Sequence, residues 1–252
     1  MNILEFNSRR PVDLNNSRIM SWFTYKNSTY MDRDAHIKGL NLGFSSNENQ
    51  YVVLKNIHLF CESIKINHRD LAIANQIHSS NVLEVTSGGV YPNVDAFVCR
   101  TPSISLGIQV ADCGAILFGD FENKIIGAAH AGWRGAVDGI IPNTVNKMVQ
   151  LGAKTKSIKV FVSACISKRN FEVGNEVAQH FPRHLVNTLD YKKPHVDLQG
   201  LLFEQLIDSE IISNNIEMDK RCTIDENELF YSFRREADKS GRMLGLIKMN
   251  KI

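Results

Sequence analysis

Short apolar runs bounded by turn-forming residues predict most of the β-strands of this chain. Runs rich in β-branched and aromatic residues, between clusters of Gly, Asn, Asp and Ser, lie at 21–25, 71–74, 82–85, 93–98 and 158–162. Residues 104–110 alternate apolar with small or polar side chains, which is typical of a half-buried strand. The runs 115–118 and 124–129 flank the polar segment 119–123 and predict a β-hairpin.

Three further segments have the spacing of an amphipathic helix. Apolar residues recur at that spacing over 48–63, which predicts a helix with one face on the core. A second series extends from about 135 to 151, although Pro142 inside it should kink the helix or delay its start. A third begins after Asp197, a plausible cap, and runs to residue 207. Strands and helices mixed in this way predict an α/β fold with mixed sheets covered by helices.

The composition limits the number of domains and the kinds of partner that we expect. The 252 residues are 43% hydrophobic, which is enough for one sizeable core, and the chain has no repeat or linker. A single domain over residues 1–252 is therefore the simplest interpretation. The formal net charge of +2 gives no reason to expect a nucleic acid or an anionic membrane as partner.

The N-terminal sequence and the number and spacing of the cysteines both predict a protein of a reducing compartment. The N-terminus lacks the pattern of a signal peptide, and no run approaches transmembrane length. Five cysteines at scattered spacings do not form a disulfide framework. We therefore expect a cytoplasmic protein.

The predicted hairpin brings two reactive side chains together. Cys113 and His130 lie at the ends of its two strands, and these ends return to the same edge. A thiol beside an imidazole on rigid strands suggests a metal site or a Cys/His catalytic pair. His78 follows the strand at 71–74 and adds a second histidine at a strand end. Three such ligands with one open position are typical of catalytic zinc; the alternative is a buried thiol among core histidines.

Three motifs resemble the signatures of a known family. They are Asn-Gln-Ile-His at 75–78, Val-Ala-Asp-Cys at 110–113 and His-Ala-Gly-Trp-Arg-Gly at 130–135, followed by a matching closing segment at 230–247. In this order they resemble the YfiH/YlmD-type, multicopper-oxidase-like laccase-domain family, and the resemblance extends from about Trp22 to Ile247. That group is described as purine nucleoside phosphorylases with adenosine deaminase activity. The resemblance implies a layered α/β/β/α arrangement.

The resemblance also implies roles for the residues near the thiol. His78, Cys113 and His130 would hold zinc, which is favoured over copper in a reducing compartment, although a His₂Cys set could accept copper. Zinc would lower the pKa of a water that attacks C6 of adenine. Asp112, next to the thiolate, is a candidate acid/base or hydrogen-bond partner of that ligand, and a turn-capping role is an equal alternative.

Phosphorolysis further requires a binding site for inorganic phosphate near the ribose C1′. Arg134, at the start of the helix near residue 135, and Arg234 are the candidate phosphate-binding residues together with Lys26. Most relatives carry arginine at the place of Lys26; lysine keeps the charge but loses the planar fork. The implied substrates are adenosine, inosine and guanosine, with S-methyl-5′-thioadenosine as a further candidate. The resemblance leaves the oligomeric state open.

Three other functions stay open from the sequence. Some relatives are described as peptidoglycan-editing hydrolases acting on a cell-wall precursor, and older descriptions name a copper polyphenol oxidase. The oxidase is the weakest of the enzyme options because the sequence has none of the His-x-His pairs that several coppers would require. The third is a non-enzymatic metal-binding module.

Overall fold

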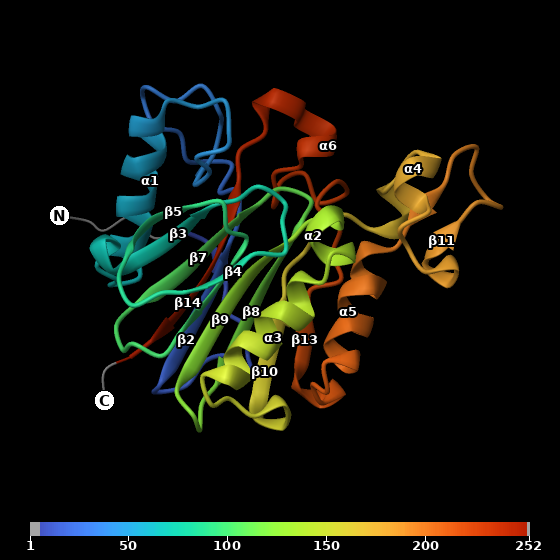
Figure 1. Cartoon of the computed structure of the whole chain (residues 1–252). Helices are drawn as coiled ribbons and strands as arrows, with labels where there is room; N and C mark the ends of the chain where they lie inside the picture. The colour runs from blue at the N-terminus through green and yellow to red at the C-terminus, as the bar shows by residue number, and fades with distance from the viewer. Residues whose placement is uncertain (1–5, 251–252) are drawn as a thin grey trace.

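The computed structural model describes residues 6–250, which form two mixed six-stranded sheets packed face to face (Figure 1). The first sheet has the order β1 (Ser8–Arg9), β2 (Ile19–Thr24), β14 (Met243–Met249), β7 (Ser105–Val110), β3 (Leu71–Asn75) and β5 (Gly89–Pro92). The second has the order β13 (Ile216–Met218), β10 (Ile158–Val162), β8 (Gly114–Asp120), β9 (Ile125–Ala131), β6 (Ala96–Cys99) and β4 (Val82–Glu84). A separate pair consists of β11 (Val186–Asn187) and β12 (His195–Val196).

Helices cover the outer faces of both sheets. The α-helices are α1 (Gln50–Ser63), α2 (Trp133–Val137), α3 (Ile140–Gln150), α4 (Asn175–Ala178), α5 (Leu198–Asp208) and α6 (Phe233–Glu236). Short 3₁₀ turns lie at His68–Asp70, Thr155–Ser157, Lys168–Asn170, Arg183–Leu185, Ser213–Asn215 and Ala237–Lys239. In Figure 1, α1 lies on one side of the paired sheets and α3 with α5 on the other, while α4 and β11 project from the body.

Three apolar clusters hold these layers together. One lies between α1 and the first sheet, and another between the second sheet and the helices α3 and α5. The third joins the two sheets, where Phe23 and Leu106 of the first meet Leu117 and Phe161 of the second. Each such side chain contributes about 1.5–3 kcal/mol by leaving water. The arrangement confirms the α/β/β/α layering that the family resemblance implied.

The predicted hairpin is present with a shorter turn. Strands β8 and β9 pair with Ala115 opposite His130, and both extend further than the apolar pattern indicates. Asp120 ends β8 and is fully buried; its Oδ1 accepts the backbone amides of Glu122 and Asn123. This side-chain cap replaces the first part of the expected turn, so the strand continues two residues beyond Phe118.

The helix expected from about 135 to 151 is two helices. Helix α2 ends before Asp138, and Gly139 has a left-handed backbone with φ of 85°. Pro142 lies in the first turn of α3, where a backbone N–H has no intrahelical partner to lose. The proline therefore fits a helix start rather than a kink, and the glycine supplies the break.

Strand β7 differs from the half-buried strand that its alternation predicts. All six of its residues are buried. The strand lies inside the first sheet, between β14 and β3, with the second sheet on one side. Its small and polar positions, such as Ser105 and Gly107, therefore face protein rather than solvent.

Within residues 6–250 no helix is both long and apolar enough to span a membrane. The expectation that the N-terminus is not a signal peptide rests largely on residues 1–5, which lie outside the described part of the chain.

Candidate functional site

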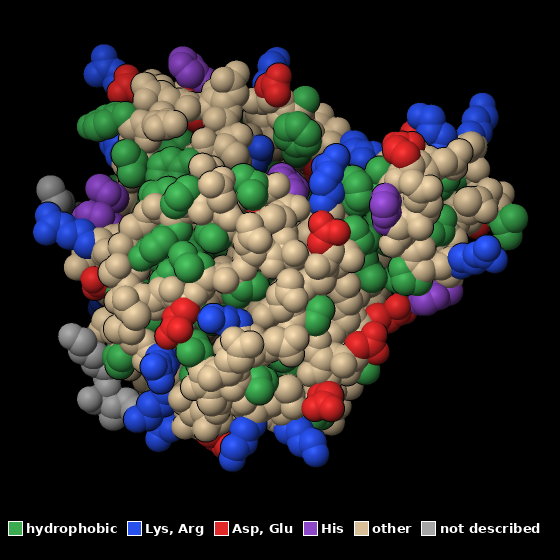
Figure 2. All heavy atoms as spheres, in the orientation of Figure 1, with side chains coloured by type: hydrophobic (Ala, Val, Ile, Leu, Met, Phe, Trp, Pro, Cys, Tyr) green, Lys and Arg blue, Asp and Glu red, His purple; other side chains and the backbone are tan. Residues whose placement is uncertain are grey.

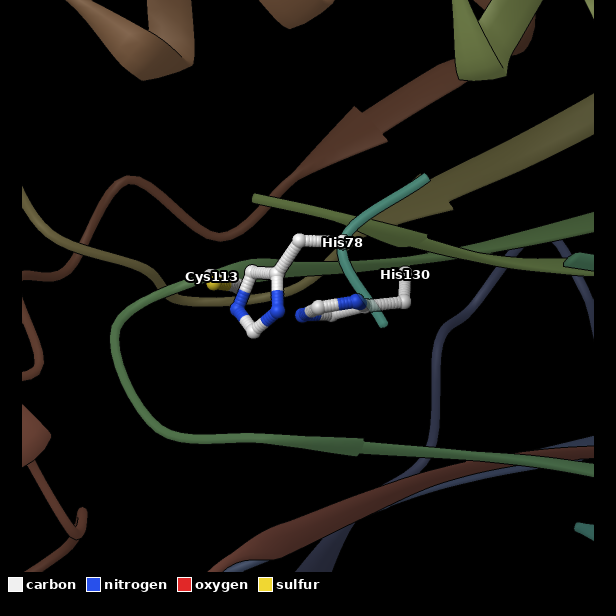
Figure 3. A group of neighbouring side chains, drawn as sticks. All are labelled: His78, Cys113 and His130. Carbon is white, nitrogen blue, oxygen red and sulfur yellow. The ribbon is translucent and has the colours of Figure 1, made fainter. Parts of the chain in front are cut away.

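His78, Cys113 and His130 lie together at one end of the paired sheets (Figure 3). Their ligand atoms all lie within 4.8 Å of one another. His78 follows β3, Cys113 lies in the connection between β7 and β8, and His130 belongs to β9. The cluster therefore straddles the two sheets, since β3 and β7 belong to the first sheet and β8 and β9 to the second. The two histidine rings are 4.8 Å apart and nearly perpendicular, at 77°.

The space beside the three side chains is shaped by a glycine. A Cβ atom at Gly132 would lie 2.9 Å from Sγ of Cys113 and 2.9 Å from Cδ2 of His78. No side chain fits there without displacing a member of the cluster. One thiolate and two imidazoles at this separation match the donor atoms that zinc prefers, so the residues present fit a metal ion.

Asp95 fixes the positions of both histidines. Its carboxylate is fully buried, and Oδ1 lies 2.8 Å from Nδ1 of His130 and 2.9 Å from the backbone nitrogen of His78. Oδ2 accepts the amides of Ile77 and Ser79 and the Ser79 hydroxyl. His78 has φ of 61°, a left-handed backbone that these bonds hold in place. With Nδ1 donating to Asp95, Nε2 of His130 is the nitrogen available to a metal.

Electrostatics within the cluster favour an ionised thiol. Burial would raise the pKa of Cys113, but the neighbouring His130 and His78 outweigh it and lower that pKa to about 6. Burial would lower the pKa of His130, but the Cys113 thiolate and Asp95 raise it to about 9. Burial would also raise the pKa of Asp95, but its hydrogen bonds to His130 and Ser79 hold it at about 2. Near neutral pH the cluster without an ion is a thiolate beside an imidazolium.

Asp112 lies next to Cys113 but is fully engaged by other groups. Oδ1 accepts the Thr223 hydroxyl at 2.6 Å, and Oδ2 accepts the backbone amide of Arg234 at 2.6 Å. Its φ of 81° is a second left-handed backbone beside the cluster. The carboxylate thus joins the Cys113 loop to the first turn of α6.

The cluster opens into a cleft of about 430 Å³, within the range of about 300–1,000 Å³ usual for small-molecule sites. Three aromatic side chains and three arginines line it in pairs. The guanidinium of Arg134 lies 4.4 Å from the Trp133 ring, that of Arg234 5.5 Å from Phe171, and that of Arg242 5.6 Å from Phe233. Figure 2 shows Lys or Arg and His side chains gathered where α2, α6 and the projecting α4–β11 segment meet.

The cleft therefore combines flat apolar faces with positive charge. Arg234 also donates to the Glu172 carbonyl, and Arg242 to the carbonyls of Ser240 and Gly241. Among the described residues none of the three guanidiniums has a carboxylate oxygen within 4.0 Å. Planar guanidiniums held on aromatic rings are suited to bind an anionic group.

Lys26 lies outside this cleft. Its Nζ pairs with Oε1 of Glu236 at 3.1 Å and lies over the Tyr231 ring. It lines a separate depression on the other side of α6. Of the residues expected to bind phosphate, Arg134 and Arg234 line the cleft beside His78, Cys113 and His130, and Lys26 does not.

Asp95 and Arg242 are among the residues of the site to which the sequence analysis gave no role. Asp95 could have been noticed as the one acidic residue directly before the apolar strand β6. Arg242 belongs to the closing segment that resembles the family, but nothing in its sequence context shows that it reaches a cleft formed around residues 78–134.

The chain is similar in sequence and in fold to proteins that are already known. A family model described as multi-copper polyphenol oxidoreductase laccase matches residues 21–250. The purine nucleoside phosphorylase of Deinococcus radiodurans is 35% identical over 181 residues, which cover 71% of this chain and 70% of that protein. Adenosine deaminase RL5, from an unknown prokaryotic organism, is 30% identical over 190 residues, covering 69% and 72%. The solved structure of YlmD from Geobacillus stearothermophilus has a TM-score of 0.87, with 22% identity and 99% of each chain covered.

Proposed function

The chain belongs to the multi-copper polyphenol oxidoreductase laccase family. Within that family we propose that it is a zinc-dependent purine nucleoside enzyme of the cytoplasm. Its reactions would be phosphorolysis of adenosine, inosine and guanosine, with S-methyl-5′-thioadenosine as a further substrate, and deamination of adenosine. The observation that carries the proposal is the His78, Cys113 and His130 cluster at a cleft lined by arginine–aromatic pairs. Relatives named as a purine nucleoside phosphorylase and an adenosine deaminase support it.

The aromatic side chains suit the purine base. Trp133, Phe171 and Phe233 offer apolar faces in the cleft, and offset stacking on such faces orients a flat ring. When bound, zinc supplies a Lewis acid that activates a water near neutral pH. In deamination the water oxygen bonds to C6, the bond from C6 to the exocyclic nitrogen breaks, and the amino group leaves as ammonia with a proton that the water gives up.

The arginines suit the phosphate of phosphorolysis. Arg134 and Arg234 would bind its oxygens, with their guanidinium planes already fixed over Trp133 and Phe171. A phosphate oxygen then bonds to C1′ while the bond from C1′ to the base nitrogen breaks. The base leaves with the bonding electrons and takes up a proton.

For Asp112 we propose a positioning role. Both carboxylate oxygens accept hydrogen bonds of 2.6 Å, from the Thr223 hydroxyl and from the Arg234 amide. The side chain therefore connects the thiolate loop to the residue that would hold phosphate. These contacts support the capping alternative over general acid/base chemistry and over a hydrogen bond to the thiolate ligand.

The test is chromatography of zinc-loaded protein incubated with adenosine, with and without phosphate. We expect adenine and ribose 1-phosphate only when phosphate is present, and inosine in both cases. Cys113→Ala should lose all products, whereas Cys99→Ala, which removes a buried thiol of β6, should keep them. Unchanged adenosine would refute the proposal and make hydrolysis of a cell-wall precursor the next reaction to assay.

A further inference from the structure

A second cavity of about 400 Å³ adjoins the metal cleft, and its size again suits a small molecule. The two share Ser45, Phe233 and Arg242. We propose that the second cavity binds the sugar of the nucleoside, with Asp238 accepting hydrogen bonds from the ribose hydroxyls. This inference rests on the proposed nucleoside function and adds a sugar subsite to it.

The two spaces differ in chemistry. Aromatic rings line the metal cleft, whereas the second cavity is lined mostly by hydroxyl, amide and charged groups, from Ser45, Ser46, Asn47, Asp238, Ser240 and Arg242. A ligand that fills both must be flat and apolar at one end and rich in hydrogen-bonding groups at the other. A purine joined to a ribose has this division.

Charge favours a neutral polar group in the second cavity. Asp238 and Arg242 carry opposite charges there, and they do not form an ion pair with each other within 4.0 Å in the described structure. A free anion would meet the Asp238 carboxylate as well as the Arg242 guanidinium. Sugar hydroxyls can donate to the carboxylate and accept from the guanidinium, so they satisfy both.

Arg242 is held rigidly at the boundary of the two spaces. Its Nη1 donates to the carbonyls of Ser240 and Gly241 at 2.8 and 2.9 Å. Asn41 Oδ1 accepts the backbone amides of both Arg242 and Gly43. A Cβ atom at Gly43 would clash with the arginine side chain, at 2.1 Å from its Cγ. The asparagine fixes the backbone of Arg242, the glycine leaves room for the aliphatic part of its side chain, and the two carbonyls hold the guanidinium.

The backbone before Asp238 is strained. Ala237 has φ of 48° and ψ of −126°, a region that residues with a side chain rarely adopt. This residue ends α6 and begins the 3₁₀ turn Ala237–Lys239. Helix α6 ends at this residue, and Asp238, which follows it, lines both this cavity and the depression beside Lys26. No protein hydrogen bond to the Asp238 carboxylate is present within residues 6–250, so the group is available to a ligand.

Phe233 marks the border between base and sugar. It lines both spaces and is 51% exposed despite its size. Arg242 lies over its ring. In the proposed pose the purine lies on the metal side of Phe233 and the ribose diol on the Asp238 side.

The test compares adenosine with 2′,3′-dideoxyadenosine, which lacks both hydroxyls of the diol. Initial deamination rates of the zinc-loaded wild type would be measured beside Asp238→Ala, Asp238→Asn and Asp208→Asn, which changes an exposed carboxylate at the end of α5. We expect Asp238→Ala to lower kcat/KM for adenosine by about 10- to 100-fold, the effect of losing hydrogen bonds to a charged group. Its kcat/KM for dideoxyadenosine should not change. Asp238→Asn should lose less, because an amide oxygen still accepts one hydrogen bond, and Asp208→Asn should match the wild type.

Equal losses for the two substrates, or an unchanged rate with adenosine, would overturn the sugar subsite. Calorimetric binding of both nucleosides to the same proteins separates the two proposals. If adenosine binds tighter than dideoxyadenosine only when Asp238 is present, the subsite stands even without turnover, and the proposed reaction alone is wrong. If the wild type binds the two nucleosides equally or binds neither, the subsite is wrong.

Discussion

Asp95 and His130 form a buried carboxylate–imidazole pair, with Oδ1 2.8 Å from Nδ1, and the same oxygen accepts the amide of His78. One carboxylate thus orients both of the proposed histidine ligands. The arrangement resembles the carboxylate–histidine–metal triads in which an outer carboxylate fixes the tautomer of a ligand.

Asp95→Asn should therefore weaken metal binding. The Nδ2 of asparagine would face backbone N–H groups that now meet a carboxylate oxygen, so at least one donor loses its acceptor. We expect zinc affinity to fall by about 10- to 100-fold, measured by competition with a chromophoric chelator. Asp138→Asn, at an exposed position after α2, is the control and should bind zinc normally. Unchanged affinity in Asp95→Asn would show that the hydrogen bonds hold the fold without tuning the ligands.

Asp95 should also make the stability of the folded protein depend on pH in the acid range. Its pKa in the folded protein, about 2, lies below the value of about 3.9 of an unfolded aspartate. The contribution is therefore complete above pH 4 or so and is lost as the pH falls through about 2. We expect the free energy of unfolding of the wild type to decrease over this range more steeply than that of Asp95→Asn, in denaturant titrations without metal. Parallel curves would contradict the depressed pKa.

Zinc binding should release protons in a number that depends on pH. Without an ion, the Cys113 thiol titrates near 6 and the His130 imidazolium near 9, and a metal binds only the deprotonated forms. We expect about one proton to be released at pH 7.5 and none well above pH 9. Calorimetry in buffers of different ionisation enthalpy measures this number. Release of no proton at pH 7.5 would mean that the two groups are not a thiolate–imidazolium pair.

Gly132→Ala should disrupt the metal cluster directly. The added methyl group would lie 2.9 Å from both Cys113 Sγ and His78 Cδ2. We expect loss of stoichiometric zinc, measured by atomic absorption after dialysis, with a normal circular dichroism spectrum. Gly152→Ala is the matched control because its methyl group would meet nothing within 4 Å, although its φ of 108° adds backbone strain. It should lower stability by about 1 kcal/mol and retain zinc.

Arg134→Ala should separate the two proposed reactions. This side chain would hold phosphate, which phosphorolysis uses and deamination does not. We expect KM for phosphate to rise by about 10- to 100-fold, as for the loss of a charge-assisted hydrogen bond, with deamination of adenosine nearly unchanged. Lys26→Ala should leave KM for phosphate unchanged, because Lys26 lies outside the cleft. A large effect of Lys26→Ala would restore the role expected from its motif.

The parts of the site that could be predicted from the sequence depend on local geometry. Cys113 and His130 are brought together by a single hairpin, and a hairpin can be predicted from two apolar runs and a polar turn. The layered fold followed from the family resemblance rather than from periodicity. The break between α2 and α3 could also have been inferred, because Gly139 and Pro142 together are a known stop and start signal.

The remaining parts depend on contacts between distant segments. Asp95 contacts His130 on the neighbouring strand and the backbone of His78 in the loop after β3. Neither contact produces a recognisable pattern in the sequence around the residues involved. The motif around Lys26 indicates a positive charge but not its direction, and the partner that turns it away, Glu236, lies 210 residues later. Burial of β7 on both faces likewise depends on which layers pack against it.

The straddling position of the three ligands has a mechanical consequence. A bound ion would cross-link the two sheets at one end, because His78 follows β3 of the first sheet, His130 lies in β9 of the second, and Cys113 lies in the connection between β7 and β8. Separating the sheets would then require breaking coordination bonds as well as exposing the apolar layer between them. At a free metal concentration 100 times Kd, binding to the folded state alone adds about 2.7 kcal/mol. If the sheets separate before the ion leaves, this energy raises the barrier to unfolding, so the metal would set the lifetime of the folded protein as well as its chemistry.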